Sequence, residues 1–201
     1  MTMQVMSLPD GLRRFALADL SREPWRNGKG WTRPVAQAGQ PDQPVWRVSL
    51  AEITQGAPFS RFEGLDRIAV LAAGGPVTLH GEGRDWPLRM PGDRACFPGE
   101  LALANTAPER EALIWNVMTR RGQARAEVDT HGEGTVSLDA DVDTLIWVVS
   151  GRYALRDAQG RELCLLGEAE GLHRPPVSKP AATLTLVAAT PDAALIRTRL
   201  A

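Results

Sequence analysis

Short runs in which apolar and polar residues alternate make up most of the chain, and turns rich in glycine and proline separate them. The run 45–53 is typical of the pattern. Successive side chains of a strand point to opposite faces, so Trp46 and Val48 would share one face. Arg47 and Ser49 would share the other face. Short runs of this kind, with regular turns and little helical periodicity, predict an all-β sandwich or barrel.

A predicted buried strand over 68–73 ends at a glycine turn, Gly74, and Arg67 stands directly before its apolar residues. If this strand lines a barrel, alternation places the Arg67 side chain on the inward face. An unpaired buried charge is strongly disfavoured, so the guanidinium needs a partner. That partner is either a ligand or a protein carboxylate, for which the candidates are Glu52, Glu63 and Asp66.

Two further segments carry polar residues that need an explanation. The run 112–118 predicts a strand, and its Asn116 needs hydrogen-bond partners if it is buried. The segment 24–33 holds two tryptophans and two glycines. One interpretation is a turn whose tryptophans cover the end of a core. The other is a loop at the mouth of a pocket, which would place there Trp25, Asn27 and Thr32.

The chain repeats itself. The segment 70–74 resembles 147–151, and a pair of later turns, each glycine, arginine and an acidic residue, has the same spacing. We therefore expect two copies of one β unit. The first, 1–121, would include an N-terminal arm and the pocket, and the second, 122–201, would be smaller.

Composition narrows the choice of partners. Lys and Arg number 23 against 24 Asp and Glu, a formal net charge of -1. Nucleic acids and acidic membranes select basic surfaces, so neither is an expected partner. No segment approaches the ~20 apolar residues of a membrane helix, and Arg13 and Arg14 interrupt any run like a signal peptide. We expect a cytoplasmic protein, in which Cys96 and Cys164 are buried small hydrophobes.

The order of the turns resembles the cupin barrel. Cupins have an apolar strand that ends in glycine, a Gly-Asp turn and a Pro-Gly before an asparagine, and this chain has Gly74, Gly92-Asp93, Pro98-Gly99 and Asn105. The metal ligands of cupins are missing, because Arg67 holds the place of the glutamate. The three histidines lie far apart in the sequence: His80, His131 and His173. A cation here would repel a divalent metal and suit an anion, since a guanidinium binds a carboxylate bidentately. We expect no metal, no cofactor and a small carboxylate as ligand.

Longer motifs sharpen the resemblance. The segments 24–30, 46–51, 58–64 and 116–122, together with Arg67, resemble the HutD/Ves family in the right order. The resemblance implies a metal-free bicupin, built from two tandem jelly-roll-like β-barrels with a pocket in the first. It also implies an association with histidine utilisation in bacteria. Members look like regulators that bind a pathway carboxylate, such as urocanate or formylglutamate, rather than like enzymes.

Carried over residue by residue, the resemblance predicts a ligand-binding set and no catalytic residue. The expected ligand-binding residues are Arg67, Arg47, Asn116, Trp25, Asn27, Thr32, Ser49 and Ser60.

Two other functions stay open. One is a metal-independent enzyme, an isomerase or hydrolase acting on the same acid, with Glu52 and His80 as the acid and base. The other is a structural interaction module that buries its faces against a partner, with a homodimer as the simplest case.

Overall fold

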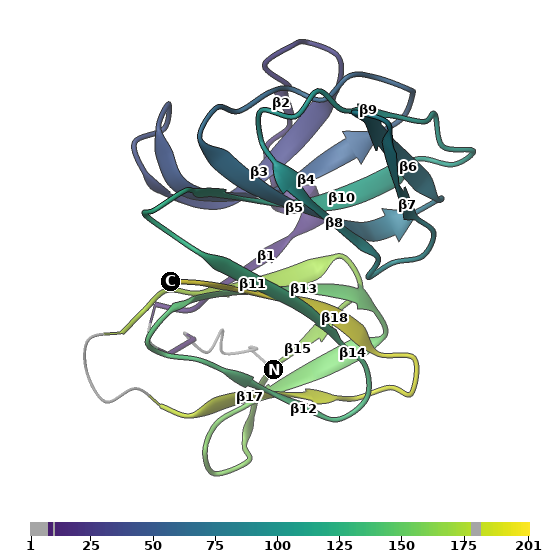
Figure 1. The fold of residues 1–201 in the computed structure, drawn as a ribbon. Coiled ribbons are helices and arrows are strands. Elements are labelled where there is room, and N and C mark those ends of the chain that lie inside the picture. Colours follow the sequence, from purple (N-terminus) through teal and green to yellow (C-terminus); the bar gives the residue numbers. More distant parts are fainter. Residues whose placement is uncertain (1–7, 10, 178–181) are drawn as a thin grey trace. The chain divides into compact units, whose positions relative to one another are not determined.

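The computed structural model describes residues 8–9, 11–177 and 182–201, and Figure 1 shows its ribbon. Apart from one turn of 3-10 helix, η1 (Leu17–Asp19), the regular structure of these residues consists of strands. The all-β class expected from the alternating pattern is confirmed. Among the same residues, no helix is long and apolar enough to cross a membrane.

The chain divides into two compact units. The middle unit is Ala18–Glu127. The terminal unit combines the described part of Met1–Leu17 with Val128–Ala201. Strand β11 (Ala126–His131) begins at this boundary.

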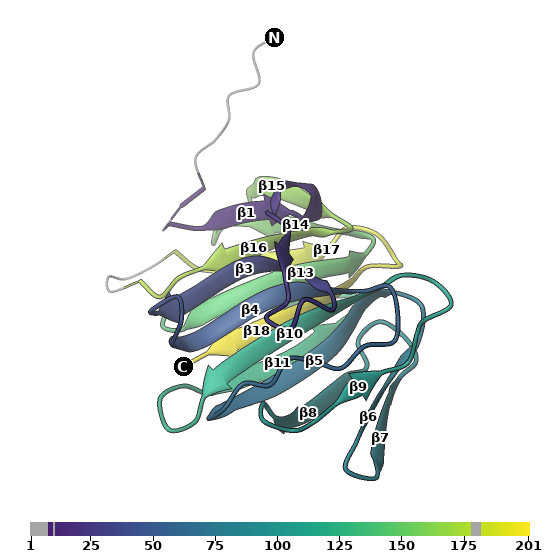
Figure 2. The same ribbon diagram turned by 90° about the horizontal axis from the view of Figure 1, so that it is seen from above.

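The middle unit contains two antiparallel sheets (Figure 2). The larger has the order β2-β3-β4-β10-β5-β8. Its strands are β2 (Glu23–Pro24), β3 (Trp31–Gly39), β4 (Pro44–Ile53), β10 (Ala112–Arg120), β5 (Leu65–Gly74) and β8 (Arg94–Pro98). The smaller has the order β7-β6-β9. Its strands are β7 (Arg84–Leu88), β6 (Val77–Gly81) and β9 (Ala104–Asn105).

The terminal unit repeats this plan with a five-stranded sheet, β1-β16-β13-β18-β11, and a four-stranded sheet, β12-β17-β14-β15. The further strands of the first sheet are β1 (Arg13–Ala16), β16 (Glu170–Arg174), β13 (Asp143–Ser150) and β18 (Ala194–Leu200). Those of the second are β12 (Thr135–Leu138), β17 (Leu184–Ala188), β14 (Arg152–Arg156) and β15 (Glu162–Gly167). In both units the strand pairs join into separate sheets, and the described pairings do not close them into rings.

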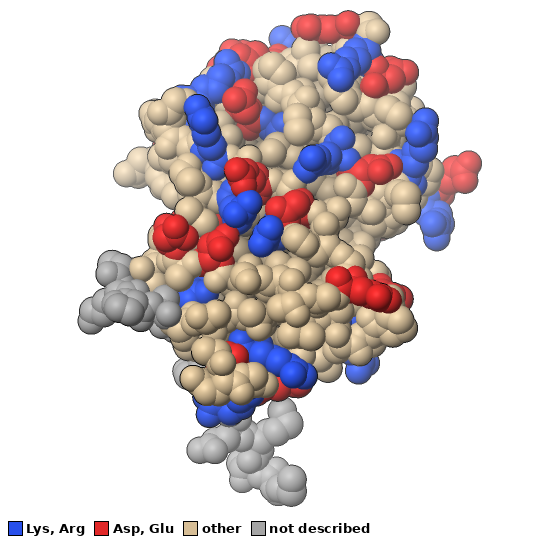
Figure 3. Space-filling model, turned by 60° about the horizontal axis from the view of Figure 1, so that its bottom comes forward, with Lys and Arg blue, Asp and Glu red and all other residues tan. Residues whose placement is uncertain are grey.

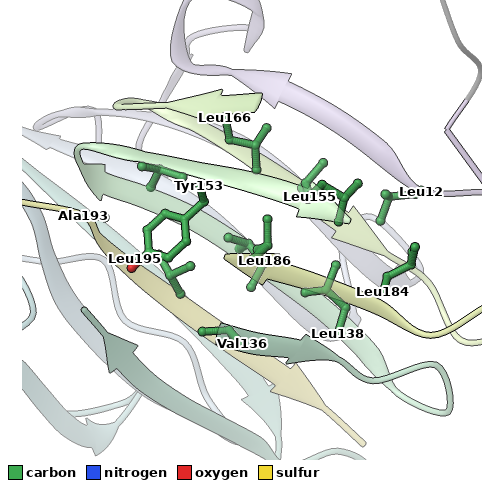
Figure 4. Close-up of a cluster of buried hydrophobic side chains, with 13 residues drawn as sticks. Leu12, Val136, Leu138, Tyr153, Leu155, Leu166, Leu184, Leu186, Ala193 and Leu195 are labelled. Carbon is green, nitrogen blue, oxygen red and sulfur yellow. The ribbon is translucent and has the colours of Figure 1, made fainter. Parts of the chain in front are cut away.

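Each unit has its own hydrophobic core. In the middle unit, Leu71 and Ile114 of the larger sheet belong to one buried cluster with Leu79 and Leu88 of the smaller. Figure 4 shows the core of the terminal unit, where Tyr153 and Leu186 lie among leucines from several strands. Two sheets that pack face to face satisfy the alternating pattern, because every second residue of a strand reaches the core.

The N-terminal arm belongs to the terminal unit and not to the first unit. We expected it in the first unit, but β1 pairs with β16 of the terminal unit, with Arg13 opposite His173. Leu12 enters the terminal core, and the Phe15 ring stacks on Trp147 at a centroid distance of 6.2 Å. Pairing with a distant strand leaves no local sequence signal, which explains the difference.

Alternation also corrects one expectation about the cysteines. Cys96 is exposed, because its neighbours Ala95 and Phe97 point into the core from β8. Cys164 is partly buried. On the face drawn in Figure 3, Lys and Arg side chains are intermingled with Asp and Glu, as the balanced composition implies.

The glycine that ends the predicted strand 68–73 has a steric reason. Gly74 adopts a φ of +91°, and a Cβ there would overlap the carbonyl oxygen of Glu111. Only glycine fits such a position without strain. The glycine therefore brings the end of β5 against the start of β10, and these two strands carry the main polar residues of the site.

Candidate functional site

A pocket of about 190 Å³ lies in the middle unit. Strands β3, β4, β5 and β10 of the larger sheet supply one part of its lining, and β2 with the loops around Trp25 and Phe59 supplies the rest. The lining residues are Glu23, Pro24, Trp25, Arg26, Thr32, Arg47, Ser49, Ala51, Phe59, Ser60, Phe62, Arg67, Asn116 and Met118. Pockets for drug-sized ligands measure ~300–1,000 Å³, so this one suits a smaller molecule. We call it the anion pocket, for the reasons that follow.

Arg67 is the buried cation of this pocket. It lies on β5 between Met118 of β10 and Phe97 of β8, and only 6% of its surface is exposed. Its Nε and Nη2 donate to Oδ1 of Asn116 at 3.3 and 3.0 Å. Its Nη1 donates to the carbonyl oxygen of Ser60 at 3.2 Å. Asn116, which needs hydrogen-bond partners because it is buried, therefore finds one in Arg67.

Three phenylalanine rings surround the Arg67 guanidinium. Its central carbon lies 5.1, 5.2 and 5.4 Å from the ring centroids of Phe59, Phe97 and Phe62. The negative faces of aromatic rings attract a cation at such distances, which offsets part of the cost of burial. Burial still lowers the pKa of Arg67 to about 10, so the group keeps its full positive charge at neutral pH.

None of the three carboxylates considered as partners forms an ion pair with Arg67. Glu52 binds Arg22 at 2.6 Å and Arg33 at 2.9 Å. Asp66 points outward from β5 and binds Arg121 at 2.9 Å. Within the described residues, the partners of the Arg67 guanidinium are an amide, a carbonyl and aromatic rings, and all of these are neutral. A positive charge thus remains uncompensated beside an open cavity.

Arg47 adds a second, half-buried guanidinium. Its Nη2 lies 3.6 Å from Oε2 of Glu23, and its buried Nε has no hydrogen-bond partner. Burial lowers the pKa of Arg47, while Glu23 acts in the opposite direction. The hydroxyl of Ser60 is also buried without a partner. Buried polar groups are nearly always hydrogen-bonded, so these two atoms are open to a bond from water or from a ligand in the pocket.

The loop between β2 and β3 closes one side of the pocket. The Trp25 indole nitrogen donates to the carbonyl oxygen of Trp31 at 2.7 Å, and its ring packs edge-on against Phe59 at 5.6 Å. The amide of Asn27 donates to the carbonyl oxygen of Pro58 at 2.8 Å and accepts from the backbone of Lys29 at 3.0 Å. Asn27 thus fastens this loop to the next one and does not itself line the pocket.

Comparison with known proteins places the chain in a family. The HutD family model matches residues 17–191. The chain belongs to the HutD family.

Two relatives and three solved structures are similar to this chain. Protein Ves of Cronobacter sakazakii is 31% identical over 66% of this chain and 74% of its own. An uncharacterized 21.2 kDa protein in the hutC 3' region of Pseudomonas putida is 27% identical over 78% of this chain and 83% of its own. A conserved protein of unknown function from Pseudomonas aeruginosa PAO1 has a TM-score of 0.80 at 25% identity, over 94% of this chain and 98% of that one.

HutD of Pseudomonas fluorescens SBW25, in a structure described as the formate condition, has a TM-score of 0.74 at 19% identity, over 94% of this chain and 99% of that one. A cupin 2 conserved barrel domain protein of Leptotrichia buccalis has a TM-score of 0.57 at 12% identity, over 98% of this chain and 100% of that one. These two likenesses show that the fold of this HutD-family chain is of the cupin type.

Of the residues predicted to bind ligand, all except Asn27 line the anion pocket. The sequence did not indicate the aromatic surroundings of Arg67. Phe59 and Phe62 were available as a signal, since they flank Ser60 in the same motif. No sequence signal pointed to Phe97, because it lies next to Arg67 only through the pairing of β8 with β5.

The pair proposed for an enzyme is not assembled as a pair. His80 bonds Asp85 at 2.6 Å across the β6–β7 hairpin, and Glu52 is held by Arg22 and Arg33. Neither Glu52 nor His80 lines the anion pocket. Among the described residues, no group of three or more His, Cys, Asp or Glu is placed to hold a metal ion.

A stability measurement separates a binding arginine from a structural one. Arg67→Met removes a buried charge that no carboxylate compensates, and the thioether fits among the phenylalanines. Asn116 and Ser60 lose a donor in this variant, but both line the pocket, where water can replace it. We therefore expect the free energy of unfolding, measured in urea, to fall by less than about 1 kcal/mol.

Arg174→Met is the matched control. Arg174 is buried in the terminal unit and donates to the carbonyl oxygens of Leu138 and Ala182 at 2.6 and 2.8 Å. We expect this variant to lose about 2–4 kcal/mol, because buried carbonyls lose charged donors. An equal loss in Arg67→Met would mean that Arg67 is a structural strut as well.

Proposed function

We propose that this HutD-family chain is a non-catalytic binding protein for a small carboxylate, with a regulatory role in histidine utilisation in the cytoplasm. The observation that carries the proposal is the buried guanidinium of Arg67, which faces the anion pocket with neutral partners only. We further propose that each unit corresponds to one barrel of a bicupin.

The chemistry of the pocket suits a carboxylate. A guanidinium has five N–H donors, and three bonds from Arg67 go to Asn116 and Ser60. One N–H remains on each terminal nitrogen, and the two oxygens of a carboxylate accept bonds from such a pair. A bound carboxylate would also neutralise the buried charge, in surroundings where Coulomb attraction is stronger than in water. The orphan hydroxyl of Ser60 supplies a further donor beside Arg67.

The candidate ligands follow from the family and from the size of the pocket. One relative is a protein of the hutC 3' region, and the HutD structure of Pseudomonas fluorescens is described as a formate condition. Urocanate and formylglutamate are the carboxylates that we expect in histidine utilisation. Formate is the smallest probe of the same chemistry.

Binding of these acids is tested by their effect on thermal unfolding. We expect one of formate, urocanate or formylglutamate to raise the melting temperature of the wild-type protein. At a hundred times its dissociation constant a ligand stabilises the folded state by ~2.7 kcal/mol, which a thermal-shift assay detects. The response should be absent in Arg67→Met and unchanged by a metal chelator.

Asn116→Asp is the most specific variant for this test. It places a carboxylate where Oδ1 of Asn116 now accepts two bonds from Arg67. We expect this internal carboxylate to keep the fold at least as stable as the wild type and to abolish acid binding. Arg121→Met changes an exposed arginine outside the pocket and should respond like the wild type. Acid binding that survives both Arg67→Met and Asn116→Asp would contradict the proposal.

The pH dependence of binding provides an independent check. Burial lowers the pKa of Arg67 to about 10 in the free protein, and a bound carboxylate would raise it again. Above about pH 10 binding must therefore be accompanied by proton uptake, and the affinity falls by up to about tenfold per pH unit. At the acid end, affinity falls as the ligand is protonated near its own pKa of ~4.

Calorimetric titrations of the acid across this range should show a level affinity between about pH 6 and 9. A step in affinity near pH 6.5 would instead assign the binding charge to a histidine.

A further inference from the structure

Arg47 stands next to the anion pocket on the same face of the sheet as Arg67. Met118 of β10 pairs with Arg67 on one side and with Arg47 on the other. The two arginines therefore lie on strands that are two positions apart, which corresponds to about 10 Å between their backbones. The pocket lining includes both side chains.

Arg47 also borders a second cavity, of about 540 Å³, which Arg67 does not border. This cavity shares Arg26, Arg47, Phe62 and Met118 with the anion pocket, so the two spaces adjoin. Its lining carries more cations than carboxylates. The charged residues are Arg26, Arg47, Arg61, Arg120, Asp42 and Glu63.

The ion pair between Arg47 and Glu23 is weak. Glu23 approaches only to 3.6 Å, and 55% of the Glu23 side chain is exposed. The buried Nε of Arg47 has no partner at all. A long ion pair to an exposed carboxylate contributes little, so another carboxylate can replace Glu23 at small cost. An incoming carboxylate could accept from Nε and Nη2 together, which Glu23 does not do in this arrangement.

From this geometry we infer that Arg47 is a second anion subsite, and that Glu23 occupies it until a ligand displaces it. The ligand class is then a dicarboxylate, with one carboxylate on Arg67 and the other on Arg47. The inference rests on the proposed function, because the first carboxylate uses the anion pocket.

In the alternative arrangement, Arg67 and Arg47 both bind the same carboxylate. The hydrogen bonds to Asn116 and Ser60, together with the phenylalanine rings, hold Arg67 at its end of the pocket. Arg47 instead reaches the border of the second cavity. Two separate acid groups match this arrangement better than one.

The test is a calorimetric comparison of acids with one and two carboxylates. The wild-type protein is titrated at about neutral pH and constant ionic strength with butyrate, succinate, glutarate and adipate. We expect the diacid of fitting length to bind at least about tenfold more tightly than butyrate. This factor corresponds to about 1.4 kcal/mol, which one additional charge-assisted contact would contribute.

Two variants change the second subsite in opposite directions. Arg47→Gln should weaken the binding of the diacid more than that of butyrate, and so reduce the advantage of the diacid to about twofold or less. Glu23→Gln removes the competing carboxylate and should raise the diacid affinity by about threefold or more, and by a larger factor than the affinity for butyrate. Arg84→Gln, an exposed residue on β7 outside both cavities, is the control and should match the wild type.

Each result decides between the two proposals. If none of the acids binds, the proposed function and this inference both fail. If butyrate binds through Arg67 but no diacid binds more tightly, the proposed function stands and the second subsite is overturned. The subsite is also overturned if Arg47→Gln weakens butyrate and the diacids equally, because both arginines would then hold one carboxylate. Because Glu23→Gln changes only an exposed side chain, it tests the subsite even if Arg47→Gln fails to fold.

Discussion

Burying a guanidinium removes its hydrogen bonds to water, so other groups must take their place. The arrangement of polar and aromatic groups around Arg67 in the middle unit follows from this constraint. Arg67 is held by an amide, a carbonyl and three aromatic rings, and no carboxylate of the described residues forms an ion pair with it. The partners fix the position of the charge without cancelling it. The structure therefore maintains a buried cation beside a cavity, and this is why we propose an anion as the ligand.

The terminal unit shows that the same fold can bury an arginine for a different purpose. The match of 70–74 with 147–151 makes Thr144 the counterpart of Arg67 in the repeat. Thr144 pairs across the sheet with Arg174, whose terminal nitrogens donate to main-chain carbonyls. The described residues line the anion pocket from the middle unit only. A cupin-type fold thus carries an arginine bound to main-chain carbonyls in one unit and a pocket-lining arginine in the other. In the middle unit, the charge at the expected glutamate position is reversed, which replaces attraction for a metal by attraction for an acid.

Much of the site could be predicted from local pattern. Alternation within 45–53 and 112–118 places Arg47, Ser49 and Asn116 on the faces where they are found, and it places Arg67 inward on β5. What could not be predicted depends on strand register and loop contacts. Phe97 meets Arg67 only because β8 pairs with β5, and Asn27 bonds Pro58 rather than facing the pocket. Such contacts join residues that are far apart in the sequence, so no periodicity reports them.

The most direct measurement of the central claim is an NMR titration of the arginine side-chain Nε–Hε signals with the acid that stabilises the protein. The account predicts that the Arg67 signal moves and saturates, because its guanidinium exchanges a neutral environment for a carboxylate. The signals of Arg22 and Arg33 should stay in place, since both bind Glu52 and neither lines the anion pocket. A titration in which the acid binds while the Arg67 signal does not move would contradict the account.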